Sequence, residues 1–184
     1  MQNTFPNVYY FVNNFNLSYI KKLKKNIAII YRNYSKKIDQ KGLKKLKTLC
    51  KEQGRKLFLA NDYKLAIKMN LDGVYIPSFN QKLNINLYTK KKNFIIIGSA
   101  HNIKEIKIKE KQKVKFIFLS PIFKVSKSNK YLGINLFKNL MTKTNSEIIA
   151  LGGINVSNFR KLKILNCYGF ASISLIKDSK KFLN

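Results

Sequence analysis

The sequence predicts an α/β protein, a single compact (β/α)8 TIM barrel with short loops, in which residues 1–184 form one domain. A chain of 184 residues has the size of one domain, and its 45% of hydrophobic residues can form one substantial core. Short apolar runs recur about every 20 to 25 residues, each followed by a lysine-rich stretch with helical spacing. Eight such units can close a barrel, whereas a doubly wound open sheet usually has about five or six strands.

The predicted strands are rich in β-branched and aromatic residues and are apolar at nearly every position. This pattern is typical of parallel strands that are buried on both faces. In chain order they are Val8 to Val12, Ile27 to Arg32, Lys56 to Ala60, Gly73 to Ile76, Phe94 to Gly98, Val114 to Leu119, Glu147 to Leu151 and Gly169 to Ser174.

The predicted helices between them carry apolar residues at three- and four-residue spacing, as helices on a sheet do. They are Leu17 to Lys25, Leu43 to Gln53, Lys64 to Met69, Ile103 to Lys111, Leu136 to Lys143 and Val156 to Leu165; the stretch Gln81 to Lys92 has the weakest pattern. Gly54 is expected to stop the second unit's helix, and Asn155 and Ser157 are expected to cap the seventh. Barrels usually exceed about 200 residues, so some outer helices should be single turns.

The net charge of +29 could indicate a surface for nucleic acid or anionic lipid. Two features argue against nucleic acid as the partner. Arginine, which nucleic-acid sites favour, occurs only at positions 32, 55 and 160, and the lysines are spread over every predicted helix. We therefore attribute the charge to a codon bias and expect it to attract small phosphorylated substrates instead.

The location predicted from the sequence is the cytoplasm, without membrane association. The N-terminus lacks the pattern of a signal peptide, and no apolar segment approaches about 18 residues. Cys50 and Cys167 lie far apart in apolar surroundings, which indicates reduced core thiols.

Candidate site residues follow from the barrel prediction, because functional groups of this fold lie at the carboxyl ends of the strands. The residues at those ends are Asn13, Arg32, Asn61, Asp62, Ser78, Asn80, Ser99, His101, Ser120 to Lys130, Gly152, Gly153 and Ser174. They are polar or cationic and include few carboxylates.

The most specific local pattern is Ala150-Leu-Gly-Gly-Ile154, paired with Ala171-Ser-Ile-Ser-Leu175 at the next strand. Glycines let backbone N–H groups approach an anion, and the usual phosphate site of a barrel lies between the loops after strands seven and eight. The alternative interpretation is a tight turn without a ligand.

Asp62 is the only one of the eight carboxylates that is predicted at a carboxyl strand end, so a two-carboxylate mechanism is disfavoured. The alternative that the sequence leaves is a single Mg²⁺ bound by Asp62 and by phosphate oxygens of the substrate. His101 is the only histidine, which excludes a histidine metal cluster, and a helix-capping role suits it better than catalysis.

Read in order, the strand ends resemble the thiamine-phosphate synthase and thiazole tautomerase (TenI-like) superfamily over nearly the whole chain. The stretches that carry the resemblance are Leu57-Phe-Leu-Ala-Asn-Asp62, Asp72-Gly-Val74, Gly98-Ser-Ala-His101, Leu119-Ser-Pro-Ile-Phe123, Ala150-Leu-Gly-Gly-Ile154 and Ser172-Ile-Ser174. The resemblance implies a transferase that joins a pyrimidine methyl diphosphate to a thiazole phosphate and expels diphosphate.

The resemblance also implies roles for individual residues. The thiazole phosphate would be bound by Gly152, Gly153, Ile173 and Ser174, and the diphosphate by Arg32 and Asn61, with Ser99 facing the diphosphate or the pyrimidine. Asp62 would anchor Mg²⁺, with Asn80 as a weaker second ligand, and Lys127 or Lys130 would supply a cation near the substrate.

Several family positions are altered. The Gln-x-Arg-x-Lys run after the second strand is Ile30-Tyr-Arg-Asn-Tyr34, the second metal aspartate is Asn80, and the Pro-Thr-x-Thr-Lys loop is Lys124-Val-Ser-Lys-Ser128. Ser120, counted here with the substrate-binding residues, stands where thiazole tautomerases have a histidine, which disfavours that activity. The alternative to a transferase is a barrel of this superfamily that binds a thiazole phosphate or another small phosphate without the original reaction.

Overall fold

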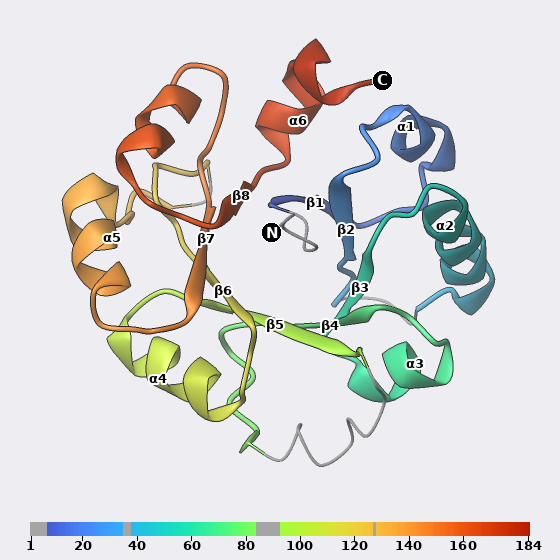
Figure 1. Cartoon of the computed structure of the whole chain (residues 1–184), viewed down its shortest axis with the longest axis horizontal. Coiled ribbons are helices and arrows are strands. Elements are labelled where there is room, and N and C mark those ends of the chain that lie inside the picture. The colour runs from blue at the N-terminus through green and yellow to red at the C-terminus, as the bar shows by residue number, and fades with distance from the viewer. Residues whose placement is uncertain (1–6, 35–37, 84–92, 127) are drawn as a thin grey trace.

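The computed structural model describes residues 7–34, 38–83, 93–126 and 128–184 and confirms the predicted barrel. Eight parallel strands pair in chain order, and β8 pairs with β1 to close the ring. Figure 1 shows the helices around the outside of this ring. No helix within the described ranges is long and apolar enough to cross a membrane.

The strands lie close to their predicted positions. They are β1 (Val8–Val12), β2 (Ile27–Tyr31), β3 (Leu57–Ala60), β4 (Gly73–Ile76), β5 (Ile95–Ala100), β6 (Phe116–Leu119), β7 (Glu147–Leu151) and β8 (Gly169–Ala171). The helices are α1 (Leu17–Lys22), α2 (Gln40–Glu52), α3 (Tyr63–Lys68), α4 (Ile103–Lys111), α5 (Gly133–Met141) and α6 (Ser174–Asp178), with 3₁₀ helices at Phe159–Ile164 and Lys180–Phe182.

Polar side chains set the starts of several helices. Asp39 accepts hydrogen bonds from the N–H groups at the start of α2, and Asp62 and Asn102 do the same for α3 and α4. Gly54 ends the α2 unit with a φ of 64°, as predicted. Most of the stretch Gln81 to Lys92 lies outside the described residues.

Two elements near the C-terminus differ from the prediction. The eighth strand ends at Ala171, because the Ser172 hydroxyl donates to the carbonyl of Ile154 and accepts from the N–H of Leu175, which turns the chain into α6. The seventh helix is a 3₁₀ helix that starts only at Phe159. The side chain of Asn155 accepts from two following N–H groups and holds residues 156–158 in a turn, whereas Ser157 donates and does not cap.

The barrel interior is a packed aromatic core. The rings of Tyr9 and Phe118 lie 4.9 Å apart, those of Phe11 and Tyr75 lie 5.2 Å apart, and both pairs meet edge to face. A second, larger core lies between the strands and the outer helices. Because side chains fill the interior, a ligand site must lie at the mouth of the barrel.

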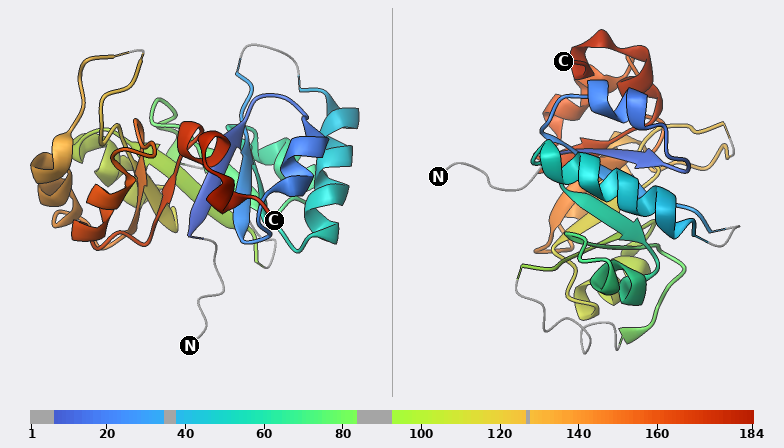
Figure 2. Two further views of the ribbon diagram at one scale, coloured as in Figure 1. Left: turned by 90° about the horizontal axis from the view of Figure 1, so that it is seen from above. Right: turned by 90° about the vertical axis from the view of Figure 1, so that its right-hand side faces the viewer.

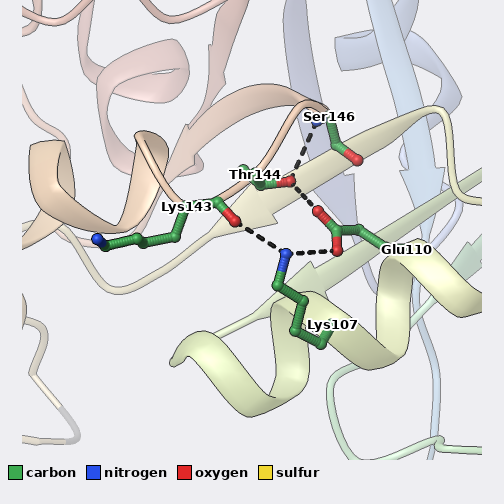
Figure 3. Close-up of polar contacts among 5 residues, drawn as sticks. All are labelled: Lys107, Glu110, Lys143, Thr144 and Ser146. Carbon is green, nitrogen blue, oxygen red and sulfur yellow. Dashed lines mark hydrogen bonds and ion pairs between the residues drawn. The ribbon is translucent and has the colours of Figure 1, made fainter.

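The opposite end of the barrel carries a polar network that joins α4 to the loop before β7 (Figure 3). Lys107 pairs with Glu110 over 2.9 Å and donates to the carbonyl of Lys143. Thr144 donates to the other oxygen of Glu110 and accepts from the N–H of Ser146. This network has a structural role, because the strands begin at this end of the barrel and the functional groups of the fold lie at the other end.

Candidate active site

The predicted site residues come together at the mouth, where the parallel strands end. In Figure 2 the loops that follow β2 and β6 rise from the same side of the barrel. The residues divide into two groups on opposite parts of the rim: those after β2, β3 and β4, and those after β7 and β8. Lys127 lies outside the described residues.

Arg32 follows β2 and extends over the barrel interior. Its N–H donates to the carbonyl of Val12, and its guanidinium carbon lies 5.1 Å from the centroid of the Phe11 ring. Burial raises the pKa of the nearby Tyr34 hydroxyl to about 12, although the positive charge of Arg32 acts in the opposite direction. This arrangement leaves a cation at the mouth, supported by an aromatic face.

Asn61 and Asn80 connect the ends of β3 and β4. Asn61 adopts a left-handed backbone with a φ of 62°, and its N–H donates to the carbonyl of Tyr75. Its side-chain oxygen accepts a hydrogen bond of 2.7 Å from the side-chain amide of Asn80. The side-chain oxygen of Asn80 accepts from the N–H of Lys82, so each oxygen of this pair already has one donor.

Asp62 lies beside Asn61 and has a structural role of its own. One carboxylate oxygen accepts from the N–H of Leu65 over 2.9 Å and caps α3. No group of three or more histidine, cysteine or acidic side chains that could hold a metal ion occurs within the described residues. A cation here would therefore be bound by Asp62, amide oxygens and the substrate itself.

A cavity of about 560 Å³ opens next to these residues. Its lining combines amides and a carboxylate with apolar and aromatic side chains: Asn33, Tyr34, Ile38, Gln40, Ala60, Asn61, Asp62, Leu65 and Phe79. The half-exposed ring of Tyr34 meets the ring of Phe79 edge to face, with 5.4 Å between their centroids. This aromatic pair was not predicted from the sequence, because its members belong to loops after different strands.

Ser99, His101 and Ser120 occupy the rim between the two groups. Ser99 is buried in β5 and hydrogen-bonds to Tyr75, whose pKa is raised by burial. His101 Nδ1 lies 2.8 Å from the carbonyl oxygen of Ser120 and 3.2 Å from its hydroxyl. Because the carbonyl is only an acceptor, Nδ1 carries the proton and is not a base for that hydroxyl. The prediction that His101 caps a helix was wrong, since Asn102 caps α4.

The second group lies where β7 pairs with β8. The register that aligns Leu151 with Ala171 brings the turn at Gly152 and Gly153 beside residues 172–174. Both glycines have left-handed backbones, with φ values of 94° and 70°. In the described part of the chain, the N–H groups of Gly153, Ile173 and Ser174 have no hydrogen-bond acceptor. Such N–H groups at adjoining turns can donate hydrogen bonds to an anion.

The loop after β6 packs against this turn. The N–H of Phe123 donates to the carbonyl of Gly152, and a Cβ atom on Gly153 would lie 2.5 Å from the carbonyl oxygens of Phe123 and Lys124. The hydroxyls of Ser172 and Ser174 both donate to the carbonyl of Ile154. The glycines thus allow close backbone approach as well as free N–H groups, while Lys130 is exposed in the neighbouring loop.

Sequence reasoning missed one polar cluster behind the site. Lys109 and Gln112 are fully buried at the end of α4 and donate to carbonyls in the loop after β4. Lys109 follows the buried Ile106 by three residues, and this spacing was the available signal that it faces inward.

Comparisons with known proteins agree with one another. Residues 21–176 match the family model described as "Thiamine monophosphate synthase". The chain is 29% identical over 163 residues to "Putative thiamine-phosphate synthase 2" of Aquifex aeolicus, covering 86% of this chain and 87% of that protein. It is 34% identical over 140 residues to a thiamine-phosphate synthase of Prochlorococcus marinus, covering 74% of this chain but only 40% of the longer relative.

A solved structure shares the fold. The thiamine phosphate pyrophosphorylase from Pyrococcus furiosus superimposes with a TM-score of 0.78 at 18% identity, covering 97% of this chain and 90% of that one.

Proposed function

The chain belongs to the thiamine monophosphate synthase family, and we propose that it joins hydroxymethylpyrimidine diphosphate to thiazole phosphate and releases diphosphate. In this reaction the bond between the pyrimidine methylene carbon and the diphosphate oxygen breaks. The thiazole nitrogen forms the new bond to that carbon, and the product is thiamine phosphate. The observation that carries the proposal is the presence of two polar groups at the mouth, one with the cation of Arg32 and one with the free N–H groups after β7 and β8, each of which suits an anion.

The group after β2 and β3 suits the leaving diphosphate. Negative charge builds on its oxygens as the carbon–oxygen bond opens, and Arg32 provides a fixed cation beside them. The side-chain amide of Asn61 is a neutral donor nearby, and Ser99 lies deeper in the same part of the mouth. Preorganised donors of this kind lower the barrier because they need little reorganisation during the reaction.

The group after β7 and β8 suits the thiazole phosphate. The free N–H groups of Gly153, Ile173 and Ser174 can donate to phosphate oxygens. The thiazole nitrogen would then face the pyrimidine carbon across the mouth. Lys130 is the described cation on the loop that borders this end, and Ser120 lies at the base of the same loop.

We propose Mg²⁺ as the cofactor, bound by Asp62 and Asn80 together with diphosphate oxygens. Hard oxygen ligands are those that Mg²⁺ prefers, and this ion commonly uses one or two carboxylates and completes its shell from the substrate. The residues fit such a site, since each hydrogen-bonded side-chain oxygen has a further lone pair. When bound, the ion would neutralise charge on the leaving group.

The cytoplasm is the proposed place of this reaction, because its phosphorylated substrates are small metabolites. The altered positions favour one other candidate. Tyr34 and Asn80 replace a cation and an acid of the family pattern, and such a mouth suits a barrel that binds thiazole phosphate without turnover.

The test is incubation of the purified protein with both substrates and Mg²⁺, followed by mass spectrometry for thiamine phosphate and diphosphate. Formation of both products in equal amounts, lost in Asp62→Asn, supports the transferase. Tight binding of thiazole phosphate without either product favours the non-catalytic barrel. Binding of nucleic acid that weakens steeply as the salt concentration rises, and with which small phosphates do not compete, would instead indicate a nucleic-acid-binding protein.

A further inference from the structure

The loop after β4 rests on two buried polar side chains at the C-terminal end of α4, those of Lys109 and of the C-cap residue Gln112. Lys109 Nζ lies 2.9 Å from the carbonyl oxygens of Pro77 and Asn80 and from the side-chain oxygen of Gln112. The side-chain amide of Gln112 donates over 2.9 Å to the carbonyls of Asn80 and Lys82. Both side chains have 0% exposure. The carbonyl of Asn80 is therefore held by two donors at once.

A buried ammonium with only neutral acceptors is an unusual core residue. Removing the charge from water is costly, so it is tolerated only where several oxygens surround it. Burial lowers the pKa of Lys109 to about 8, although Glu105 acts in the opposite direction. The aliphatic stem passes over Gly98 of β5, where a Cβ atom would lie 3.0 Å from its Cδ. A smaller apolar residue could fill the position, but it could not hold the loop.

The far side of this loop faces the mouth. The backbone that Lys109 and Gln112 hold belongs to Asn80, whose side chain reaches Asn61 at the end of β3. The preceding residue, Phe79, meets the ring of Tyr34 after β2. The contacts thus run continuously from the helix layer through the loop to the residues that border Arg32 and Asp62.

We propose that Lys109 and Gln112 are positioning residues that fix the diphosphate side of the mouth through the loop of residues 77–82. This inference rests on the proposed function for its kinetic consequence. It predicts a larger effect on the diphosphate substrate than on thiazole phosphate, since the side-chain hydrogen bonds of Lys109 and Gln112 to the backbone go to residues 77–82, whereas the thiazole phosphate end is built from β7 and β8.

The kinetic test compares Lys109→Met, which keeps the stem, with Lys111→Met on the exposed face of the same helix. We expect the KM for the pyrimidine diphosphate to rise roughly 10- to 100-fold in Lys109→Met, as for other displaced binding groups. The KM for thiazole phosphate should stay within about twofold, and Lys111→Met should resemble the parent protein. Equal changes in both KM values would overturn the inference, because a general loss of stability affects both ends.

Gln112→Glu provides a second variant that keeps the acceptor for Lys109 and removes the two amide donors. It should show the same split between the two KM values. If Lys109→Met does not fold, a parent-like pair of KM values in Gln112→Glu contradicts the inference.

Hydrogen–deuterium exchange separates this inference from the proposed function, because it needs no substrate. The N–H groups of Asn80 and Lys82 are bonded within the loop to the carbonyl of Pro77 and the side chain of Asn80. Their exchange should accelerate roughly tenfold in Lys109→Met and Gln112→Glu while the amides of β7 keep the parent rates. Faster loop exchange in a protein without transferase activity would refute the proposed reaction and retain the positioning role. Unchanged loop exchange would refute the positioning role.

Discussion

The side-chain amide of Asn80 donates to the side-chain oxygen of Asn61 over 2.7 Å and ties the end of β4 to the end of β3. Asn61 directly precedes Asp62, which is the single carboxylate of the proposed cation site, and Asn80 is hydrogen-bonded to Asn61. A second carboxylate at position 80 would bind a divalent cation more strongly than an amide does. The pair therefore provides a direct way to vary the metal dependence.

Asn80→Asp should lower the Mg²⁺ concentration for the half-maximal rate by roughly tenfold, because it adds an anionic oxygen ligand. Asn80→Ala removes the ligand and should raise that concentration. Initial rates across a Mg²⁺ titration measure both effects. Identical Mg²⁺ curves for the two variants would show that residue 80 does not contact the ion.

Arg32→Ala should reduce kcat about 10²- to 10³-fold, because it removes the fixed cation beside the leaving diphosphate. Arg160 is exposed and lies on the 3₁₀ helix Phe159–Ile164 instead of the loop after β2, so Arg160→Ala is the matched control for the loss of one positive charge. Single-turnover rates separate this effect from product release. A similar small loss in both variants would mean that Arg32 contributes only to the general positive field.

Gly153→Ala should abolish binding of thiazole phosphate and destabilise the fold by about 1–3 kcal/mol. A Cβ atom there would meet the carbonyls of Phe123 and Lys124 at 2.5 Å, in addition to the strain of a φ of 70°. Gly54 has a similar φ of 64° but no atom within 4 Å of its added Cβ. Gly54→Ala should therefore cost only about 1 kcal/mol and leave binding intact. Thermal unfolding and ligand titration compare the two.

Glu110→Gln should destabilise the protein by about 1 kcal/mol near neutral pH, because it weakens the network in Figure 3. Burial acts to raise the pKa of Glu110, but the hydrogen bonds from Lys107 and Thr144 outweigh it and lower the pKa. A carboxyl group with a lowered pKa stabilises the fold above its unfolded pKa and loses this contribution as the pH falls through the folded value.

The difference between the parent protein and Glu110→Gln should accordingly shrink as the pH falls below about 4. Urea unfolding at several pH values measures it. Lys107→Met should also weaken the pH dependence of the free energy of unfolding, because it removes one of the groups that lower the pKa of Glu110. A difference that grows in acid would contradict the assigned sign.

The barrel was predictable from sequence because its signal is repetitive: eight buried strands with the same composition, separated by helices of the same period. The ends of elements were less predictable where side chains compete with the backbone. Ser172 ends β8 earlier than expected, and Asn155 delays the seventh helix, since both hydrogen-bond to local backbone groups.

The candidate site was predicted in outline, because strand ends converge in this fold whatever their sequence. Its contacts across the rim could not be derived, since they join residues from separate loops. The bond between Asn61 and Asn80 and the rings of Tyr34 and Phe79 are of this kind. The spacing of Lys109 from Ile106 fits a position that faces inward, but in a chain with so many lysines on its predicted helices this signal was too weak to identify a buried one.

The most direct test of the proposal that the mouth binds both substrates is isothermal titration of thiazole phosphate. The titration is done with and without Mg²⁺ and an unreactive analogue of the pyrimidine diphosphate. The proposed division of the mouth into two neighbouring anion sites predicts that the affinity for thiazole phosphate rises at least about fivefold when the other components are present. Equal affinity under both conditions, or no binding of thiazole phosphate, would contradict an assembled site for two substrates.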